Sequence, residues 1–109
     1  MGNDVRMTAS VIAVLSAFLA DPNDERYGLD LMKDTGLASG TLYPILARLE
    51  RAGWVGAAWE DIDPAVEGRP GRRYYRMTPD GVVSARHELA AIHQRLSRVA
   101  GLSGRVSEA

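Results

Sequence analysis

The 109-residue sequence contains no cysteine, which excludes disulfide frameworks, thiolate zinc sites and cysteine nucleophiles. It also lacks an apolar run of the kind that crosses a membrane. The apolar stretch near the N-terminus is preceded by Asn3 and Asp4 and followed by the acidic segment 21–25, so it resembles neither a signal peptide nor a membrane span. We therefore expect a cytoplasmic protein with no membrane partner.

Groups that would support catalysis or hold a metal ion are missing as a set. His87 and His93 lie six residues apart on a predicted helix, which does not place two ligands on one face, and no third ligand is evident. Asp30, Asp34 and Glu50 form no acid–base pair, and no glycine-rich phosphate loop follows a predicted strand. We expect no metal, no cofactor and no enzyme activity.

The net charge is only −1, which argues against nucleic-acid binding by bulk attraction. Positive charge is nevertheless concentrated in GRPGRRYYR, residues 68–76, which hold four arginines and no acid. Residues 1–47, by contrast, carry three basic and six acidic groups. An anionic partner is therefore expected to meet the protein at the arginine segment.

The composition is that of one small globular domain. Hydrophobic residues make up 46% of the chain and charged residues 25%, both ordinary for soluble proteins. Small domains bury a smaller fraction of their surface than large ones, so a partner subunit would add stability. Size alone therefore favours a dimer.

Helical spacing of apolar residues predicts two helices in the first 36 residues. The first takes Thr8 or Ser10 as its cap and ends at Asp21. The second is short, turns Leu29 and Met32 inward, and ends at the glycine of position 36, which favours a left-handed cap.

A third predicted helix follows after only two further residues. It takes Ser39 as its cap and ends at Gly53. Its apolar stripe consists of Leu42, Ile45, Leu46 and Leu49. Two helices joined by so short a connection must cross at an angle, as in a helix-turn-helix.

Two strands are predicted next, over residues 54–60 and 72–77. The segment 61–71 between them is polar and rich in glycine and proline, so it is expected to be a loop. The strands form a hairpin with a long tip. Tyr74 and Tyr75 in the second strand are expected to pack half-buried.

The last predicted helix takes Thr78 as its cap and Pro79 as its first residue. Apolar residues then recur three and four positions apart, the pattern of helices that pair with other helices. This seam consists of Val82, Ala85, Leu89, Ile92, Leu96 and Val99. Residues 101–109 are expected to form a loose tail.

This order of elements predicts a mainly α protein with a small β-hairpin, arranged as a winged helix-turn-helix with a C-terminal dimerisation helix. The winged, DNA-binding domain would span residues 5–78, and the dimerisation helix residues 79–100.

The third helix carries a glycine and a proline where a recognition helix would meet DNA. At about 100° per residue, Gly40, Pro44 and Arg51 lie opposite the apolar stripe, with Tyr43 and Arg48 beside them. Small side chains let the backbone approach a duplex closely, and the helix N-terminus favours a phosphate. The alternative is that the glycine and proline only shape the start of a structural helix whose arginines are solvated.

The hairpin tip carries Arg69, Arg72 and Arg73, which can reach phosphates or a minor groove. A solvated charged surface is the alternative. Trp54 and Trp59 are candidates for an aromatic ligand pocket near the dimer interface, although a tryptophan at a strand start is more often core packing.

Residues 27–81 also resemble the PadR family of transcriptional regulators. Three segments carry the resemblance: YGLDLMKDTG, SGTLYPILARLERAGWV and EGRPGRRYYRMTPDG. The resemblance implies a winged helix, dimerisation through the C-terminal helix, and repression relieved by a small, often aromatic, ligand. It implies DNA contacts by the arginine segment 69–73 and by Ser39, Gly40, Thr41, Tyr43 and Pro44. The chain has only one helix after the wing and a short turn before Ser39, and in both features it resembles the shorter members of the PadR family.

We therefore expect a ligand-responsive repressor that binds a palindromic double-stranded DNA operator as a homodimer. The alternative is a winged-helix module that binds another protein and never DNA, for which the near-neutral net charge is the best support. A small hydrolase or metal enzyme has no nucleophile, base or ligand set to name.

Overall fold

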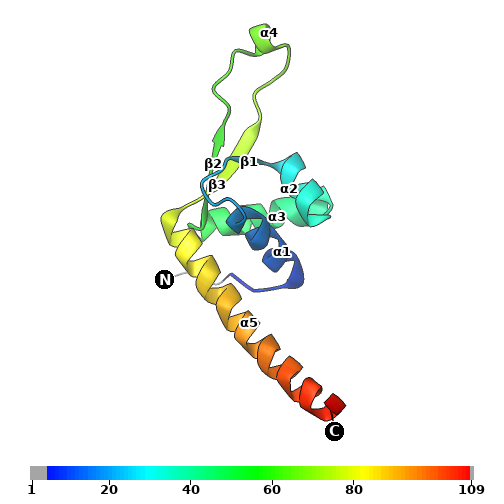
Figure 1. The fold of residues 1–109 in the computed structure, drawn as a ribbon. Helices are drawn as coiled ribbons and strands as arrows, with labels where there is room; N and C mark the ends of the chain where they lie inside the picture. Colours follow the sequence, from blue (N-terminus) through cyan, green and yellow to red (C-terminus); the bar gives the residue numbers. More distant parts are fainter. Residues whose placement is uncertain (1–4, 109) are drawn as a thin grey trace.

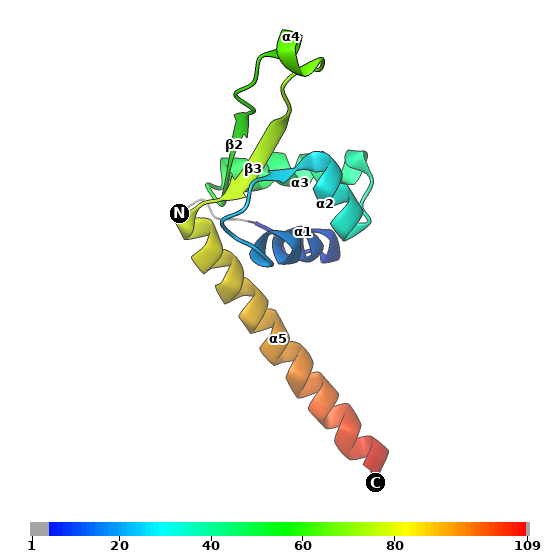
Figure 2. The same cartoon turned by 45° about the horizontal axis from the view of Figure 1, so that its top comes forward.

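The computed structural model describes the backbone of residues 5–108 and the side chains of residues 5–101. Three helices pack below a small sheet, the β2–β3 hairpin projects to one side as the wing, and α5 leaves on the other (Figures 1 and 2). This arrangement confirms the predicted winged-helix fold. The elements in chain order are α1 (Ala9–Leu19), β1 (Arg26–Tyr27), α2 (Gly28–Thr35), α3 (Ser39–Arg51), β2 (Val55–Trp59), α4 (Pro64–Glu67), β3 (Arg73–Met77) and α5 (Pro79–Glu108).

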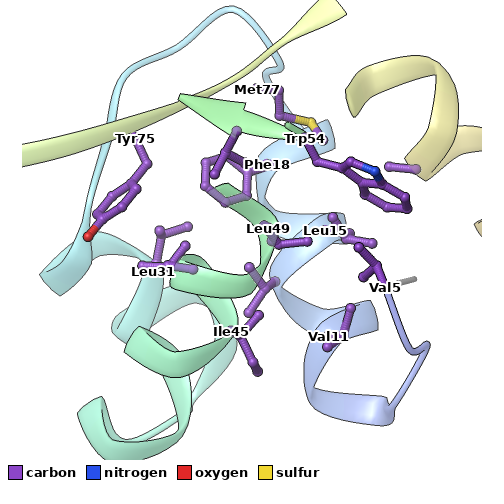
Figure 3. Close-up of a cluster of buried hydrophobic side chains, with 14 of the residues drawn as sticks. Val5, Val11, Leu15, Phe18, Leu31, Ile45, Leu49, Trp54, Tyr75 and Met77 are labelled. Atoms are coloured by element: carbon purple, nitrogen blue, oxygen red, sulfur yellow. The ribbon is translucent and has the colours of Figure 1, made fainter. Parts of the chain in front are cut away.

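The apolar stripes of α1 and α3 form the centre of the core. Phe18 and Leu15 of α1 and the predicted stripe of α3 are almost completely buried. Figure 3 shows Trp54 and Met77 at one side of this core and Tyr75 and Leu31 at the other. The predicted half-burial of Tyr75 is thus exceeded, since only 6% of its surface is exposed.

Two cap predictions meet different outcomes. Thr8 caps α1, where its hydroxyl oxygen accepts a hydrogen bond of 3.2 Å from the Val11 amide. Ser39 does not cap α3, because it is already the first helical residue. Ala38 takes the cap position without a side-chain bond, and its carbonyl accepts from Thr41 at 3.0 Å and from the next amide at 2.9 Å.

The inward position predicted for Leu29 is wrong. The helix α2 buries Gly28 and Leu31, which lie three residues apart on one face. Leu29 lies on the opposite side, with 69% of its surface exposed. The second predicted end is confirmed, since Gly36 closes α2 with a positive φ of 74°.

The sheet has three antiparallel strands in the order β1-β3-β2, so the predicted hairpin has an extra edge strand. Strand β1 is two residues long, too short for any periodic signal, and pairs Arg26 with Tyr75 and Tyr27 with Tyr74. Arg26 is held there by the Ala17 carbonyl at 2.7 Å and by an ion pair with Asp34. The predicted loop between the longer strands contains the four-residue helix α4.

The start of α5 is fastened to the turn between α3 and β2. The Thr78 hydroxyl donates to the Gly53 carbonyl at 2.7 Å and accepts from the Gly81 amide at 2.9 Å, and the Thr78 amide donates to the Trp54 carbonyl at 3.0 Å. A Cβ on Gly81 would collide with that same carbonyl, so glycine is required there. These contacts fix the direction in which α5 leaves the domain.

The helix α5 extends further than predicted. It continues to Glu108, whereas a loose tail is expected from residue 101; Ala109 lies outside the described residues. No proline interrupts this segment, and an isolated glycine such as Gly101 costs a helix only about 1 kcal/mol. Gly101 therefore does not mark the C-terminal end of α5.

Candidate nucleic-acid interface

The first turns of α3 present a surface with few large side chains. Ser39, Gly40, Thr41 and Pro44 are all exposed, as predicted for the outward face. Lower on the same helix, Arg48 and Arg51 are also exposed. Neither arginine forms an ion pair with any residue in the described part of the chain.

Nothing in the fold requires glycine at position 40. A Cβ built on Gly40 would meet no atom within 4 Å, and its φ is not positive. Pro44 lies four residues later and has no amide hydrogen to donate to the Gly40 carbonyl, yet α3 continues through it. The lack of side chains here is therefore a property of the surface and not a packing requirement.

Tyr43 lies between this surface and the start of α2. Its ring covers Gly28, where any Cβ would collide with the tyrosine hydroxyl group. The ring is 43% exposed, so Tyr43 packs between helices and still presents part of its surface beside the start of α3. Its position is therefore compatible both with packing between helices and with a contact at the outer surface of α3.

The wing arginines lie beside α3, but most of them are paired with acids. Arg69 pairs with Glu60 at 2.7 Å and Arg73 with Glu50 of α3 at 3.2 Å. Arg73 also lies over the ring of Trp59, 5.6 Å from its centroid. The segment 68–76 has no acid of its own. These acidic partners come from other segments, and no local pattern in the sequence predicts them.

Arg72 differs from its neighbours. Its side chain is exposed and forms no ion pair with the described residues, while Arg76, which lies on the face of β3 opposite to Arg73 and Tyr75, pairs with Glu25 at 3.3 Å. Residues 60–73 contain four acids and three arginines, a net charge of −1. The wing as a whole is therefore not positively charged, and its free positive charge is confined to Arg72.

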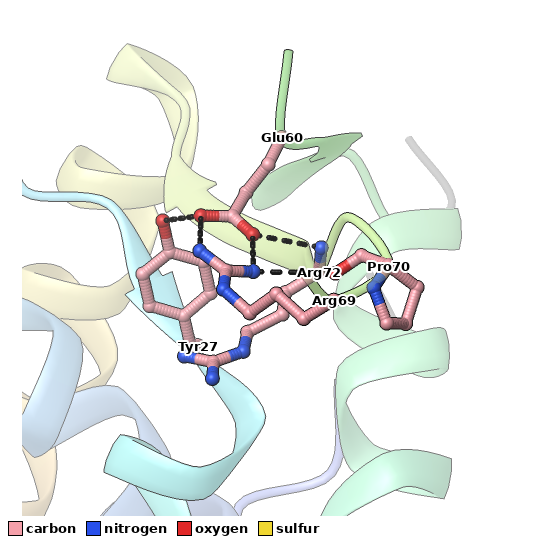
Figure 4. A network of polar contacts seen from close by, with 5 residues as sticks. All are labelled: Tyr27, Glu60, Arg69, Pro70 and Arg72. Atoms are coloured by element: carbon pink, nitrogen blue, oxygen red, sulfur yellow. Dashed lines mark hydrogen bonds and ion pairs between the residues drawn. The ribbon is translucent and has the colours of Figure 1, made fainter. Parts of the chain in front are cut away.

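Glu60 accepts hydrogen bonds from three parts of the sheet and wing. Its carboxylate receives the Arg69 guanidinium at 2.7 and 3.3 Å, the Arg72 amide at 2.9 Å and the Tyr27 hydroxyl at 3.1 Å (Figure 4). The bond from Arg69, followed by that from the Arg72 amide, lowers the pKa of Glu60 from 4.5 to about 2. Burial, followed by the hydrogen bond to Glu60, raises the pKa of the Tyr27 phenol.

A hollow of about 550 Å³ separates the inner face of the wing from the starts of α2 and α3. Its walls include the rings of Tyr27, Tyr43, Trp59 and Tyr75 and the side chains of Arg72 and Arg73. Leu29, Tyr43 and Trp59 are three of the seven large apolar side chains that the described part of the chain leaves exposed, and all three line this hollow. Exposed apolar surface is thus gathered beside the outer surface of α3.

The two tryptophans do not share a pocket. Trp59 lines the hollow and is 64% exposed, but Trp54 is 3% exposed and packs in the core. Trp59 is the last residue of β2, whereas Trp54 directly precedes the strand, where Val55 pairs with Met77 near the base of the sheet. The prediction of a joint Trp54–Trp59 pocket is therefore wrong, and core packing accounts for Trp54.

The match to a family model covers residues 17–87 and is described as "Transcriptional regulator PadR-like family". The chain belongs to the PadR-like family. Among curated proteins, none matches it.

Three solved structures illustrate the fold that this PadR-like chain shares. The smu.1704 protein of Streptococcus mutans has a TM-score of 0.68 at 21% identity, covering 90% of this chain and 92% of that one. A PadR-like transcription factor from Bacteroides fragilis has a TM-score of 0.61 at 22% identity, covering 80% and 85%. The PcaV transcriptional regulator of Streptomyces coelicolor, in complex with its natural ligand, has a TM-score of 0.57 at 21% identity, covering 87% and 75%.

The predicted seam of this PadR-like protein divides into two parts along α5. Ala85 is completely buried by its own subunit, and Val82 and Leu89 pack against the same core. Ile92 is half-buried, and Leu96 and Val99 are 63% and 59% exposed. The prediction that Ala85 belongs to a dimer interface is wrong, because the domain itself covers that residue.

The helices of the described residues include none that is both long and apolar enough to span a bilayer. Within the same residues, no group of three potential metal-binding side chains is found.

Proposed function

We propose that this protein is a sequence-specific transcriptional regulator that lays the start of α3 in a major groove and the wing along the flanking backbone. The observation that carries the proposal is the exposed start of α3, where Gly40 has open space around it although the fold does not need a glycine. A backbone without side chains can approach a base edge or phosphate closely. Ser39, Thr41, Tyr43 and Pro44 would contact the duplex beside it, and Arg48, Arg51 and Arg72 its phosphates. Such a regulator would work in the cytoplasm with the DNA.

The regulator would act as a homodimer on a palindromic operator. Ile92, Leu96 and Val99 form an apolar stripe on the part of α5 that projects beyond the domain, and a second copy would cover it. Residues 79–100 would then be the dimerisation helix and residues 5–78 the DNA-binding domain. Two-fold symmetry would place the half-sites about one helical turn apart or a multiple of it. Occupying an operator blocks the polymerase, so repression is the expected outcome.

A small aromatic effector would bind in the hollow beside α3. The four rings that line the hollow, together with its volume, suit a flat molecule of ordinary ligand size. PcaV, a protein of similar fold, has been solved with its natural ligand, which makes ligand response a reasonable property to test here. A molecule in this hollow would compete with DNA for the inner face of the wing, and Trp59 fluorescence would report its binding.

The proposal is tested by fluorescence anisotropy with labelled DNA from upstream of the protein's own gene, over a series of salt concentrations. We expect affinity to fall steeply with salt, with a logarithmic slope of about −0.9 for each phosphate contacted. A scrambled duplex of the same composition should bind more weakly. An affinity that does not change with salt would contradict phosphate contacts.

One observation favours the alternative of a protein-interaction module. The wing is net negative, and acids hold two of the three wing arginines. In that case neither the operator nor the scrambled duplex would bind, and alanine at Arg48 and Arg51 would change nothing in the DNA assay. Loss of DNA affinity in that double variant would exclude the alternative.

A further inference from the structure

We infer that Glu60 is the residue that positions the wing, that Arg69 serves as its strap, and that the phosphate contact of the wing falls to Arg72. The DNA part of this inference rests on the proposed function. It reverses the simple expectation that all three arginines at the tip contact DNA. The geometry of one carboxylate carries the argument.

Glu60 lies where the paired strands give way to the tip of the wing. Its amide donates to the Arg72 carbonyl at 2.8 Å, and its carboxylate accepts from the Arg72 amide at 2.9 Å, so both bonds join the two sides of the wing at one level. The Tyr27 hydroxyl adds a bond from β1 at 3.1 Å. A Cβ at position 71 would lie 3.2 Å from the Glu60 carbonyl, so Gly71 allows this close approach. Glu60 therefore joins both sides of the wing to the edge strand.

Arg69 has little freedom to leave this carboxylate. It makes a two-pronged contact at 2.7 and 3.3 Å, a geometry that is stronger than a single bond, and only 14% of the Glu60 side chain is exposed. If Arg69 moved to a DNA phosphate, it would leave a nearly buried negative charge beside a negative duplex. That arrangement costs free energy twice, through the unpaired acid and through like-charge repulsion.

Arg72 has the opposite properties. Its backbone is fixed by Glu60 on two sides, while its guanidinium lines the hollow between the wing and α3 without an acid partner among the residues described. A duplex lying on α3 would pass this side of the wing. The Glu60 contacts thus fix the point from which the Arg72 side chain reaches the DNA backbone.

The test compares Glu60→Gln, Arg69→Gln and Arg72→Gln with the wild type, together with the double variant Glu60→Gln/Arg69→Gln. Two quantities are measured: the salt slope of operator binding and the hydrogen exchange of the residue-72 amide by NMR without DNA. We expect Arg72→Gln to make the slope shallower by about 0.9, and Arg69→Gln to leave it unchanged while weakening affinity several-fold. The double variant should bind the operator more tightly than Arg69→Gln alone, because it also removes the unpaired Glu60 carboxylate that would repel the duplex.

Without DNA, Glu60→Gln and Arg69→Gln should speed exchange of the Arg72 amide about tenfold, while the melting temperature falls by only a few degrees because the core is untouched. If Arg69→Gln made the salt slope shallower by as much as Arg72→Gln does, Arg69 would contact DNA and the proposed strap role would be wrong. Unchanged exchange in Glu60→Gln would overturn the positioning role. If the wild type failed to bind any duplex, the proposed function would fall, and the exchange result would still decide the role of Glu60.

Discussion

The outer surface of α3 and the wing both face the proposed duplex, but they differ in how much of their chemistry the protein itself uses. On α3, Arg48 and Arg51 form no ion pair with a described residue, and a Cβ at Gly40 would meet no atom within 4 Å. In the wing, Glu60 and Glu50 hold two of the three tip arginines. One surface is therefore free to bind, while the other is mostly occupied by its own ion pairs.

This difference teaches that local charge in a sequence does not measure the charge available to a partner. The arginine segment contains no acid, yet strand pairing brings Glu60 opposite it and α3 brings Glu50 beside it. The same division recurs along α5, where Leu89 packs on its own domain and Leu96 does not. Whether a charged or apolar side chain is available to a partner therefore depends on its exposure and pairing in the folded protein, and not on the local composition.

The largest effect is expected from filling the free surface of α3. Gly40→Leu should lower operator affinity at least about a hundredfold, because the added side chain holds the backbone away from the groove. The melting temperature should not fall, since the new Cβ meets no atom within 4 Å. Anisotropy and thermal denaturation measure the two effects. Gly56→Leu is the control, because it adds the same side chain to an open glycine on β2. Equal losses in both variants would mean that the α3 surface has no special role.

The next effect is expected on the free part of α5. Leu96→Asp should raise the dimer dissociation constant about thirtyfold, equivalent to about 2 kcal/mol of lost apolar burial. Light scattering across a dilution series measures the change in mass. Ser97→Asp adds the same charge one residue later, off the apolar stripe, and should leave the dimer intact. A dimer that tolerates Leu96→Asp would have its interface elsewhere.

Leu89→Asp is a useful contrast to that experiment. Leu89 packs against the core of its own domain, so we expect this change to lower the melting temperature and not only the mass. The sequence alone cannot tell that Leu89 packs in its own domain and Leu96 does not, because both residues fit the same helical periodicity. Only the position at which α5 leaves the domain divides them, and that is fixed by Thr78 and Gly81 at the other end of the helix.

Much of the fold could be predicted because its signals are local. The stripe of α3, the caps at Thr8 and Gly36 and the Thr78–Pro79 helix start each depend on neighbouring residues, and the structure bears them out. The errors involve contacts between distant segments. Strand β1 is defined only by its pairing with β3, and α2 buries Gly28, beneath Tyr43, and Leu31, which leaves Leu29 exposed.

The candidate site was predictable to the same degree. Small residues on the outer face of α3 follow from helical geometry alone, and they are exposed as expected. The hollow is lined by residues of five elements, β1, α2, α3, β2 and β3, so no local pattern marks it. Trp54 and Trp59 have no local pattern that distinguishes them, but Trp54 directly precedes β2 and packs in the core, while Trp59 ends the strand and is exposed on the projecting wing.

Neutralising single arginines sharpens the comparison between the two surfaces. Arg48→Gln and Arg51→Gln should each make the salt slope of operator binding shallower by about 0.9, because each removes one phosphate contact. Arg73→Gln should change the slope much less, since Glu50 and the Trp59 ring already engage that guanidinium. Anisotropy titrations at four or more salt concentrations measure the slopes. If Arg73→Gln changed the salt slope as much as Arg51→Gln does, the Arg73–Glu50 ion pair of the free protein would not persist on DNA.

The smallest effect is expected at low pH, where protonation of Glu60 weakens the contacts of the wing. The folded protein holds the pKa of Glu60 at about 2, below its usual 4.5, so the unfolded chain takes up a proton first as the pH falls. The stabilisation from the Glu60 carboxylate is therefore complete above about pH 5 and is lost as the pH falls toward 2. Glu60→Gln has no carboxylate to protonate. The melting-temperature difference between wild type and this variant should stay constant above pH 5 and shrink below it. A difference that persisted down to pH 2 would mean that the Glu60 charge does not stabilise the wing, leaving hydrogen-bond geometry as the only link between its two sides.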